Sequence, residues 1–380
     1  TNILAIPIIG FFIVPLGFCA FLLSFFSQPL AGILIDCCTI ILSCTIDIAL
    51  ILSNLSYTWS IVPSFKSIWI WLYYFAAVSL FFFLLRATKR AVAGVVICIM
   101  ILGSIILKDG ENLFGNPTPS NLTITILDVG QGNAAVIRSP EGHNILIDGG
   151  GFSDTSRFDT GRMIVAPYLW SQNVRHIDTV ILTHPESDHL NGILFILEHF
   201  NVKTLIKNMD DSDSMNYRKL VKLCRQHNIR VNALDTPAKS YSAGNLTLQF
   251  FLPAAHMYLS DFNNRSLVAK LVYHQFSMLF AGDILQKRER FMISISGKKL
   301  FSDLLLAPHH GSNTSSTKFF LDHVQPKGVI ISCGFKNRYG FPHPDVLKRY
   351  MDINSDIYRT DIHGAVTITT GGQNYQVHTV

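Results

Sequence analysis

The sequence predicts a membrane segment of apolar helices followed by a soluble α/β domain with a layered sandwich fold. Residues 1–107 carry only six charged side chains, which is typical of membrane-spanning helices. Residues 108–380 instead alternate short β-branched runs with helical patterns, and several of these runs end in His or Asp. Strands with interspersed helices favour a layered α/β sandwich over a parallel dinucleotide-binding sheet.

Charge and cysteine content narrow the class of protein. The net charge of +5 divides into +2 on residues 1–107 and +3 on the remainder. Neither part has the strong basic excess that indicates nucleic-acid binding, so charge neither supports nor excludes a nucleic-acid substrate. Five of the seven cysteines lie in apolar segments, and only Cys224 and Cys333 fall in the second part. This distribution indicates neither a disulfide framework nor a cysteine-rich zinc site.

The first membrane helix is expected between Ile3 and Phe26, within a run to Ile35 that contains no charged residue. Such a run is long enough to cross a bilayer. Residues 36–54 differ, because their polar side chains return to one helical face. A polar stripe with two carboxylates predicts an amphipathic helix at the membrane interface or lining a wet cavity. The stripe consists of Asp36, Ser43, Asp47 and Asn54.

Two further charge-free runs, residues 68–85 and 91–107, are each long enough for a membrane helix. Residues 86–90 between them hold three basic side chains, which predicts a cytoplasmic loop. We therefore expect residues 1–107 to be the end of a multi-pass inner-membrane domain, with about three transmembrane helices plus the amphipathic helix. The soluble domain is then extracytoplasmic. A chain that begins with Thr1, without a signal-peptide pattern, is expected to be a piece of a longer membrane protein.

Residues 108–120 contain two glycines and two prolines and are predicted to be a linker, so the sandwich domain covers residues 121–380. The turn at residues 130–132 is not a dinucleotide-binding motif, because the third Gly and the following helix are missing. A helix is expected over residues 161–170, with Pro167 inside it. Strands are predicted over residues 122–129, 134–138, 144–147, 178–182, 204–206, 246–251, 267–273, 278–281, 304–306 and 328–332.

The stretch from Thr183 to His189 carries the clearest chemical signal. It follows the buried strand at residues 178–182 and precedes a helical pattern, so its side chains can converge on one point from a loop. Imidazole nitrogens and carboxylate oxygens are ligands of divalent ions such as Zn²⁺ and Mn²⁺. A simple helix cap would need one Asp only. The loop therefore predicts metal ligation by two imidazoles, His184 and His189, and by one or two carboxylates, Glu186 and Asp188.

Other predicted strands also end in ligand-type residues. Asp148 follows residues 144–147, Asp283 follows residues 278–281, and His309 with His310 follows residues 304–306. Each position has a structural alternative, such as helix capping by Asp283. Their repeated placement at strand ends nevertheless favours one joint metal site.

With these residues assembled, the soluble part resembles the metallo-β-lactamase-like domain of the ComEC family of DNA-uptake (competence) membrane proteins. Residues 1–26 resemble the end of the membrane competence domain of the same family, so residues 1–107 would be the C-terminal part of that domain. The order of the motifs carries the resemblance. They are Asp128–Gly132, Asp148–Gly150, His184–His189, Asn263–Val268, Gly282–Asp283, His309–Ser312, Phe341–Pro344 and Thr360–Ala365.

The resemblance implies an αββα sandwich with metal ions at one edge. It also implies a role in bringing DNA across the inner membrane, with DNA, the lipid bilayer and other DNA-uptake proteins as partners. The soluble domain would degrade the strand that does not enter. The implied metal ligands are His184, Asp188, His189, Asp283 and His310, of which Asp188, Asp283 and His310 are also the expected catalytic residues. Asp148, Glu186, His309 and His343 are further candidates for ligation or ligand orientation, and Ser312, Lys336 and Arg338 for phosphate contact.

One departure concerns the metal. The wider superfamily favours His-x-His-x-Asp-His, and Glu186 occupies the second His position. Fewer nitrogen ligands favour Mn²⁺ or Mg²⁺ over tightly held Zn²⁺ at that position. We expect one or two divalent ions, Mn²⁺ or Zn²⁺ before Mg²⁺.

The leading hypothesis is a metal-dependent deoxyribonuclease that hydrolyses DNA phosphodiesters, with the ion activating water and neutralising phosphate charge. Glu186 keeps open an alternative, a catalytically degenerate domain that binds DNA or caps a channel. A third hypothesis keeps the fold but assigns a small ester, lactam or choline phosphoester as substrate.

Overall fold

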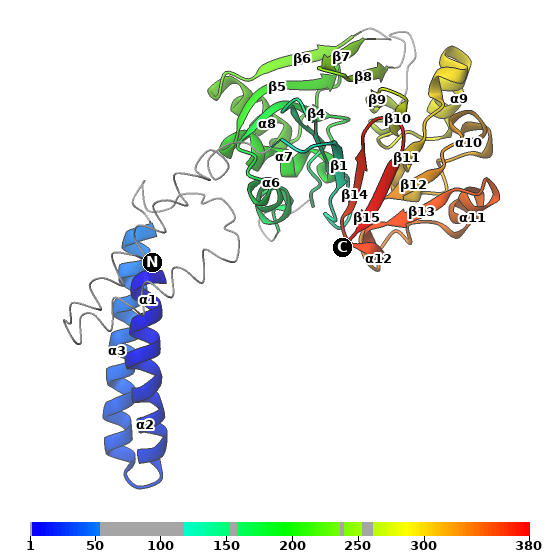
Figure 1. Ribbon diagram of the computed structural model, residues 1–380. Helices are drawn as coiled ribbons and strands as arrows, with labels where there is room; N and C mark the ends of the chain where they lie inside the picture. The colour runs from blue at the N-terminus through cyan, green and yellow to red at the C-terminus, as the bar shows by residue number, and fades with distance from the viewer. Residues whose placement is uncertain (1, 54–117, 153–157, 236–238, 253–260) are drawn as a thin grey trace, which may run out of the picture. The chain divides into compact units, whose positions relative to one another are not determined.

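The computed structural model describes residues 2–53, 118–152, 158–235, 239–252 and 261–380 (Figure 1). The chain divides into an N-terminal helical unit and a larger unit that contains both sheets. The membrane helices expected over residues 68–85 and 91–107 lie outside the described residues.

The N-terminal unit is helical over nearly all its described length. Two of its stretches, Ala5–Ser24 and Gln28–Leu52, are long and apolar enough to cross a membrane by length and composition. Pro15 follows a π-helical turn within one continuous run of helical backbone, where the hydrogen-bond pattern changes from π to α. The elements are α1 (Asn2–Ile8), a π-helical turn (Ile9–Ile13), α2 (Val14–Ser24) and α3 (Gln28–Ser53).

The polar stripe expected on a helix from Asp36 is part of α3, which begins eight residues earlier at Gln28. Asp36 and Asp47 are both exposed on this helix. The helix continues through Asp36 because the residues before it are apolar and contain no interior proline, since Pro29 falls in the first turn. The predicted amphipathic segment is therefore the second part of a longer helix.

The first sheet of the larger unit has eight strands in the order β15-β14-β1-β2-β3-β4-β5-β6 (Figure 1). Its first half is antiparallel, and β3, β4, β5 and β6 are parallel neighbours. The strands are β1 (Leu122–Ile126), β2 (Ala135–Arg138), β3 (Asn144–Ile147), β4 (His176–Leu182), β5 (Asn201–Asn208), β6 (Arg230–Leu234), β14 (Val366–Thr370) and β15 (Tyr375–Thr379).

The second sheet has seven strands in the order β13-β12-β11-β10-β9-β8-β7. Here β10, β11, β12 and β13 are parallel neighbours and the other pairs are antiparallel. The carboxyl ends of parallel strands share one edge of a sheet, so loops that follow them converge there. The strands are β7 (Ser240–Ala243), β8 (Leu246–Phe251), β9 (Val268–Tyr273), β10 (Phe276–Phe280), β11 (Leu304–Leu306), β12 (Gly328–Ile331) and β13 (Asp356–Arg359).

Three apolar clusters hold these layers together. The largest joins the facing surfaces of the two sheets, with Ile124 and Phe250 among its fully buried members. A second packs α6 (Ala166–Ser171), α7 (Ser187–His199) and α8 (Met215–Gln226) on the outer face of the first sheet. A third packs α9 (Gln286–Ser296), α10 (Lys318–Val324) and α11 (Pro344–Asp352) on the outer face of the second. The αββα sandwich implied by the motifs is confirmed (Figure 1).

The helix expected over residues 161–170 is a π-helical turn (Gly161–Val165) that continues directly into α6, with Pro167 inside α6. The backbone is helical through the junction, so Pro167 lies where the hydrogen-bond pattern changes from π to α. Several peripheral strands, among them β6 and β7, were not predicted. Their side chains are largely exposed, so they lack the apolar signature of a buried strand.

Candidate metal centre

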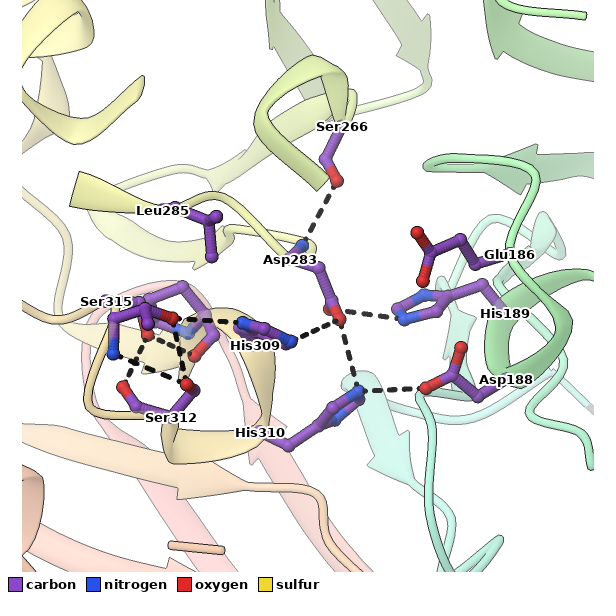
Figure 2. Close-up of polar contacts among 12 residues, drawn as sticks. Glu186, Asp188, His189, Ser266, Asp283, Leu285, His309, His310, Ser312 and Ser315 are labelled. Atoms are coloured by element: carbon purple, nitrogen blue, oxygen red, sulfur yellow. Dashed lines mark hydrogen bonds and ion pairs between the residues drawn. The ribbon is translucent and has the colours of Figure 1, made fainter. Parts of the chain in front are cut away.

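The predicted ligands come together where strands of both sheets end. Asp188 and His189 lie in the first turn of α7, just after β4. Asp283 follows β10, and His310 follows β11. Their ligand atoms all lie within 4.8 Å of one another, and we call these residues the four-residue cluster (Figure 2). Parallel pairing of β10 with β11 explains why Asp283 and His310 are neighbours.

Asp283 lies at the centre of the cluster, as Figure 2 shows. Its Oδ1 atom is 3.1 Å from Nε2 of His189, and its Oδ2 atom is 3.3 Å from Nε2 of His310. The same nitrogen of His310 is 3.4 Å from Oδ2 of Asp188. His309 is more distant, with its Nε2 atom 4.0 Å from Oδ2 of Asp283. One carboxylate thus faces three imidazoles, an arrangement that suits a ligand shared by cations.

Asp148 fixes His189 from behind the cluster. Its Oδ2 atom accepts a hydrogen bond from Nδ1 of His189 at 2.7 Å and another from the hydroxyl of Thr183 at 2.8 Å. Its Oδ1 atom accepts from the backbone N–H of Thr183 at 2.8 Å. With Nδ1–H donating to a carboxylate, the lone pair of His189 lies on Nε2, which faces the cluster. Asp148 therefore orients a ligand.

His310 is oriented in the same way by the backbone. Its Nδ1–H donates to the carbonyl oxygen of Ser332 at 2.9 Å, which turns Nε2 towards Asp188 and Asp283. Both His309 and His310 have positive φ angles, of 50° and 56°. Such backbone is uncommon outside glycine and marks a position held by its surroundings. The loop after β11 is thus shaped to present these imidazoles.

His184 is fully buried beside the cluster, with its ring centroid 4.1 Å from that of His189. Its Nδ1 atom lies 3.0 Å from the hydroxyl of Thr183 and 3.3 Å from that of Ser266. Its Nε2 atom lies 4.0 Å from Oε2 of Glu186. His184 and Glu186 therefore offer two ligand atoms for a second cation beside the four-residue cluster, which is fewer than the four that the cluster itself offers.

Electrostatics in the cluster favour positive charge. Burial would raise the pKa of Asp188, but the neighbouring imidazoles of His310 and His189 lower that pKa to about 2. Burial would lower the pKa of His310, but Asp283 and Asp188 raise it to about 10. Burial lowers the pKa of His184 to about 3, which leaves its imidazole neutral. The buried carboxylates thus attract a proton to His310, and the same field attracts a metal cation.

Unpartnered atoms show that these residues fit a divalent ion. Within the described part of the chain, the buried atoms His184 Nε2, His189 Nε2, His310 Nε2 and Asp283 Oδ1 have no hydrogen-bond partner. The distance of 3.1 Å between His189 Nε2 and Asp283 Oδ1 is short, yet the pair lacks hydrogen-bond geometry. Buried polar atoms are normally paired, so atoms that approach without bonding indicate ligands of a shared cation.

The four remaining candidates each lie in a different setting. His343 is the N-cap of α11, where its Nδ1 atom accepts from the backbone N–H of Asp345, and it is not brought into the cluster. The hydroxyl of Ser312 is buried and bonds to Thr314. Lys336 is exposed over the ring of Phe335. Arg338 lines the pocket described next.

A pocket of about 740 Å³ opens onto the cluster. Asp188, His309 and His310 lie on its wall together with Glu186. The pocket is also lined by four aromatic side chains and one cation, namely Phe152, Phe335, Tyr339, Phe341 and Arg338. A substrate of nucleotide size can therefore reach the cluster from solvent.

Two supporting features were not predicted from sequence. Thr183 and Ser266 lie inside the motifs at residues 183–189 and 263–268, but their residue types are not metal ligands and no role was assigned to them. In the structure both hydroxyls contact the imidazole of His184. Gly132 has a φ of 117°, and a Cβ there would overlap the backbone of Asp188. The glycine-rich turn thus packs directly against the ligand loop, aided by the N–H of Asn133 donating to the carbonyl oxygen of Asp188 at 3.2 Å. In the sequence, the Gly-x-Gly spacing of residues 130–132 was the signal that could have indicated this close packing.

Comparison with known families agrees with this geometry. Residues 127–334 match the family model of the metallo-beta-lactamase superfamily, and residues 1–87 match that of the competence protein family. Among solved structures, the diiron β-hydroxylase CmlA from Streptomyces venezuelae is 15% identical, with a TM-score of 0.43, covering 67% of this chain and 55% of its own. Igni18, a metallo hydrolase from Ignicoccus hospitalis, is 15% identical with a TM-score of 0.41, covering 64% and 98%.

Three relatives of known name align with most of this chain but with a smaller share of their own length. ComE operon protein 3 of Bacillus subtilis is 26% identical over 76% of this chain and 38% of its own length. Competence protein ComA of Neisseria gonorrhoeae is 28% identical over 65% and 32%, and recombination protein 2 of Haemophilus influenzae is 29% identical over 70% and 31%. The chain thus spans about a third of the length of these relatives.

Proposed function

We propose that this chain, which belongs to the metallo-beta-lactamase superfamily and joins that domain to a competence segment as in the ComEC family, hydrolyses DNA phosphodiesters with a divalent cation held by the four-residue cluster. Within a complete protein, the hydrolysis degrades the strand that is not carried across the inner membrane. Relatives named as competence and recombination proteins support this role. The sandwich then lies on the extracytoplasmic side, next to incoming DNA.

The observation that carries the proposal is the convergence of two carboxylates and two imidazoles on one point beside an open pocket. Oxygen and nitrogen donors in this mixture suit Mn²⁺ or Zn²⁺, and Mg²⁺ less well. When bound, such an ion lowers the pKa of water and neutralises charge on a phosphodiester. The chain itself supplies four donors that are already placed for it.

The surrounding residues have separable roles. Asp148 holds Nε2 of His189 towards the cluster, and the carbonyl of Ser332 does the same for His310. Asp283 lies between the imidazoles of His189 and His310, where its negative charge attracts a cation. His309 lines the pocket near Asp283, where its imidazole can donate a proton to a leaving oxygen. Arg338, which lines the same pocket, supplies a cation for the phosphate backbone.

Glu186 favours one alternative to DNA hydrolysis. In this alternative the domain binds DNA or caps a channel and does not cleave DNA. Burial raises the pKa of Glu186 to about 7, and the neighbouring Asp188 adds to the rise. Glu186 stands where the superfamily pattern has a second His, and it lies 4.0 Å from His184. A cation bound between these two residues would therefore have one nitrogen ligand fewer than in the superfamily pattern. A degenerate domain predicts that loss of Asp188 changes neither metal content nor DNA cleavage.

The test is cleavage of labelled single- and double-stranded DNA by the chain in detergent, with Mn²⁺, Zn²⁺, Mg²⁺ or a chelator. Asp188→Ala is compared with Asp322→Ala, an exposed Asp on α10 outside the pocket. Metal-dependent cleavage that Asp188→Ala abolishes and Asp322→Ala retains supports the proposal. Absence of cleavage with every ion, in a protein that still binds DNA, favours the alternative.

A further inference from the structure

We propose that the loop from Gly334 to Phe341 is a stacking platform for unpaired nucleobases, which makes the neighbouring metal centre selective for single-stranded DNA. This inference rests on the proposed function, because it takes the strand at the cluster to be DNA. The loop follows β12 and precedes α11, and it forms much of one wall of the pocket.

The first observation is the exposure of large aromatic rings at the pocket. Phe335 is 71% exposed and Tyr339 is 51% exposed. Both line the same pocket as Asp188 and His310, and Phe152 from the loop after β3 also lines it. Aromatic rings gathered at one pocket can form a binding surface. Nucleobases stack on such rings without sequence preference, because every base has a π-face.

The rings form a continuous path from the cluster outwards. The His309 ring, which approaches Asp283, lies edge-on to that of Phe341 with a centroid separation of 5.7 Å. The rings of Phe341 and Tyr339 are stacked, with centroids 5.5 Å apart and planes inclined by 19°. A base next to a phosphate at the cluster would therefore lie beside this run of aromatic rings.

Charge on the loop matches a nucleic-acid strand. Between Gly334 and Phe341 the only charged residues are Lys336 and Arg338, and both are basic. The Arg338 guanidinium lies 4.8 Å from the centroid of the Tyr339 ring, and the Lys336 ammonium lies 5.2 Å from that of Phe335. Alternating cations and rings can engage phosphates and bases of one strand together. An apolar protein partner would gain nothing from these cations.

The loop is held in shape before any ligand arrives. The side-chain amide of Asn337 donates to the carbonyl oxygens of Gly334 at 2.9 Å and Phe341 at 2.6 Å. Its oxygen accepts from the backbone N–H groups of Tyr339 at 3.2 Å and Phe341 at 2.9 Å. One side chain thus ties both ends of the loop together. Preorganisation of this kind lowers the entropy that is lost on binding.

Selectivity follows from the state of the bases. In a duplex the bases are stacked on one another, so their faces are not free to pack on Phe335 and Tyr339. A single strand can turn a base onto the rings at little cost. The platform therefore favours the unpaired strand, and its binding depends on the presence of bases as well as phosphates.

The test measures binding of two fluorescein-labelled oligonucleotides of equal length to the full chain in detergent, by fluorescence anisotropy. One is oligothymidylate, and the other carries tetrahydrofuran abasic residues on the same phosphate backbone. We expect the wild type to bind the base-bearing strand about tenfold more tightly. Tyr339→Ala and Phe335→Ala should each lower this ratio several-fold, and Tyr339→Trp should restore it. Phe319→Ala, which removes an exposed ring on α10 outside the pocket, should leave the ratio unchanged.

A wild-type ratio near one, or a ratio that neither alanine variant changes, overturns the platform. DNA cleavage assayed in parallel separates the two proposals. Cleavage with a ratio near one means that the nuclease stands and the platform fails. A ratio that depends on the rings, without cleavage under any ion, means that the platform stands and the proposed hydrolysis fails.

Discussion

The Oδ2 atom of Asp148 accepts a hydrogen bond of 2.7 Å from Nδ1 of His189, whose other ring nitrogen faces Asp283. A carboxylate in this position fixes the tautomer and direction of a metal-binding imidazole. Because Asp148 also accepts from Thr183, it ties the end of β3 to the loop after β4. The geometry of the cluster thus depends on a residue that contributes no ligand atom to it.

Asp148→Asn is expected to weaken divalent-metal binding by roughly 10- to 100-fold, since an amide has only one accepting oxygen and cannot accept from both the Thr183 N–H and Nδ1 of His189. Isothermal titration with Mn²⁺ and Zn²⁺ measures the change. Asp178→Asn is the matched control, because Asp178 makes a similar contact of 3.0 Å to His176 on β4 without a part in the cluster. Equal affinities in wild type and Asp148→Asn would show that Asp148 does not orient a ligand.

Metal removal should lower the thermal stability of the sandwich. An ion that binds only the folded state stabilises it by mass action, so a chelator should lower Tm of the wild type. In Asp283→Asn the charge that faces His189 and His310 is gone, and the same chelator should have a much smaller effect. Thermal unfolding with and without EDTA measures the change in Tm of the wild type and of Asp283→Asn. A chelator effect of equal size in the variant would place the bound ion elsewhere.

Gly192→Ala should destabilise the fold and impair cleavage. A Cβ at Gly192 would overlap the backbone carbonyl of Gly149, so α7 would have to move away from the loop after β3. Forced overpacking of this kind costs on the order of 1–3 kcal/mol. Gly371→Ala is the control, because its nearest neighbour, an Asn121 oxygen, would lie at an ordinary 3.7 Å. Denaturant unfolding compares them, and equal stability of both variants would contradict the close approach.

Glu289 should make stability depend on pH. Burial raises its pKa from 4.5 to about 7, although the N–H groups of Ser316 and Thr317 donate to it. Because the folded state favours the protonated form, this group stabilises the fold below about pH 4.5, and the contribution is lost as the pH rises through about 7. The unfolding free energy of wild type should therefore fall more between pH 4.5 and 8 than that of Glu289→Gln. Parallel pH dependence in the two proteins would contradict this assignment.

The sequence predicted the buried parts of the fold well. The apolar runs at residues 144–147 and 304–306 are β3 and β11, because a strand buried on both faces reads as a continuous hydrophobic run. The exposed strand β6 was missed, since Arg230 and Asn232 give it the composition of a loop. Pairing with β5, which only the folded chain shows, makes it a strand.

The candidate site was predicted as a set of residue types at strand ends, and the structure shows their directions. His343 illustrates the difference, because its sequence context matches a ligand while its Nδ1 atom caps α11. Asp148 is the reverse case. Its motif marked it as important, but only the hydrogen bond from His189 shows that it orients a ligand. The aromatic wall of the pocket was not predicted, because Phe335 and Phe152 are far apart in sequence.

DNA hydrolysis by this chain should require an ion held by the four-residue cluster. Titration of Mn²⁺ into the metal-depleted chain, with bound metal and cleavage of single-stranded DNA recorded in the same samples, tests this requirement. Cleavage should rise in proportion to occupancy of a site that Asp188→Ala and Asp283→Ala both lack. Cleavage that persists in a chelator, or in both variants with their metal lost, would contradict it.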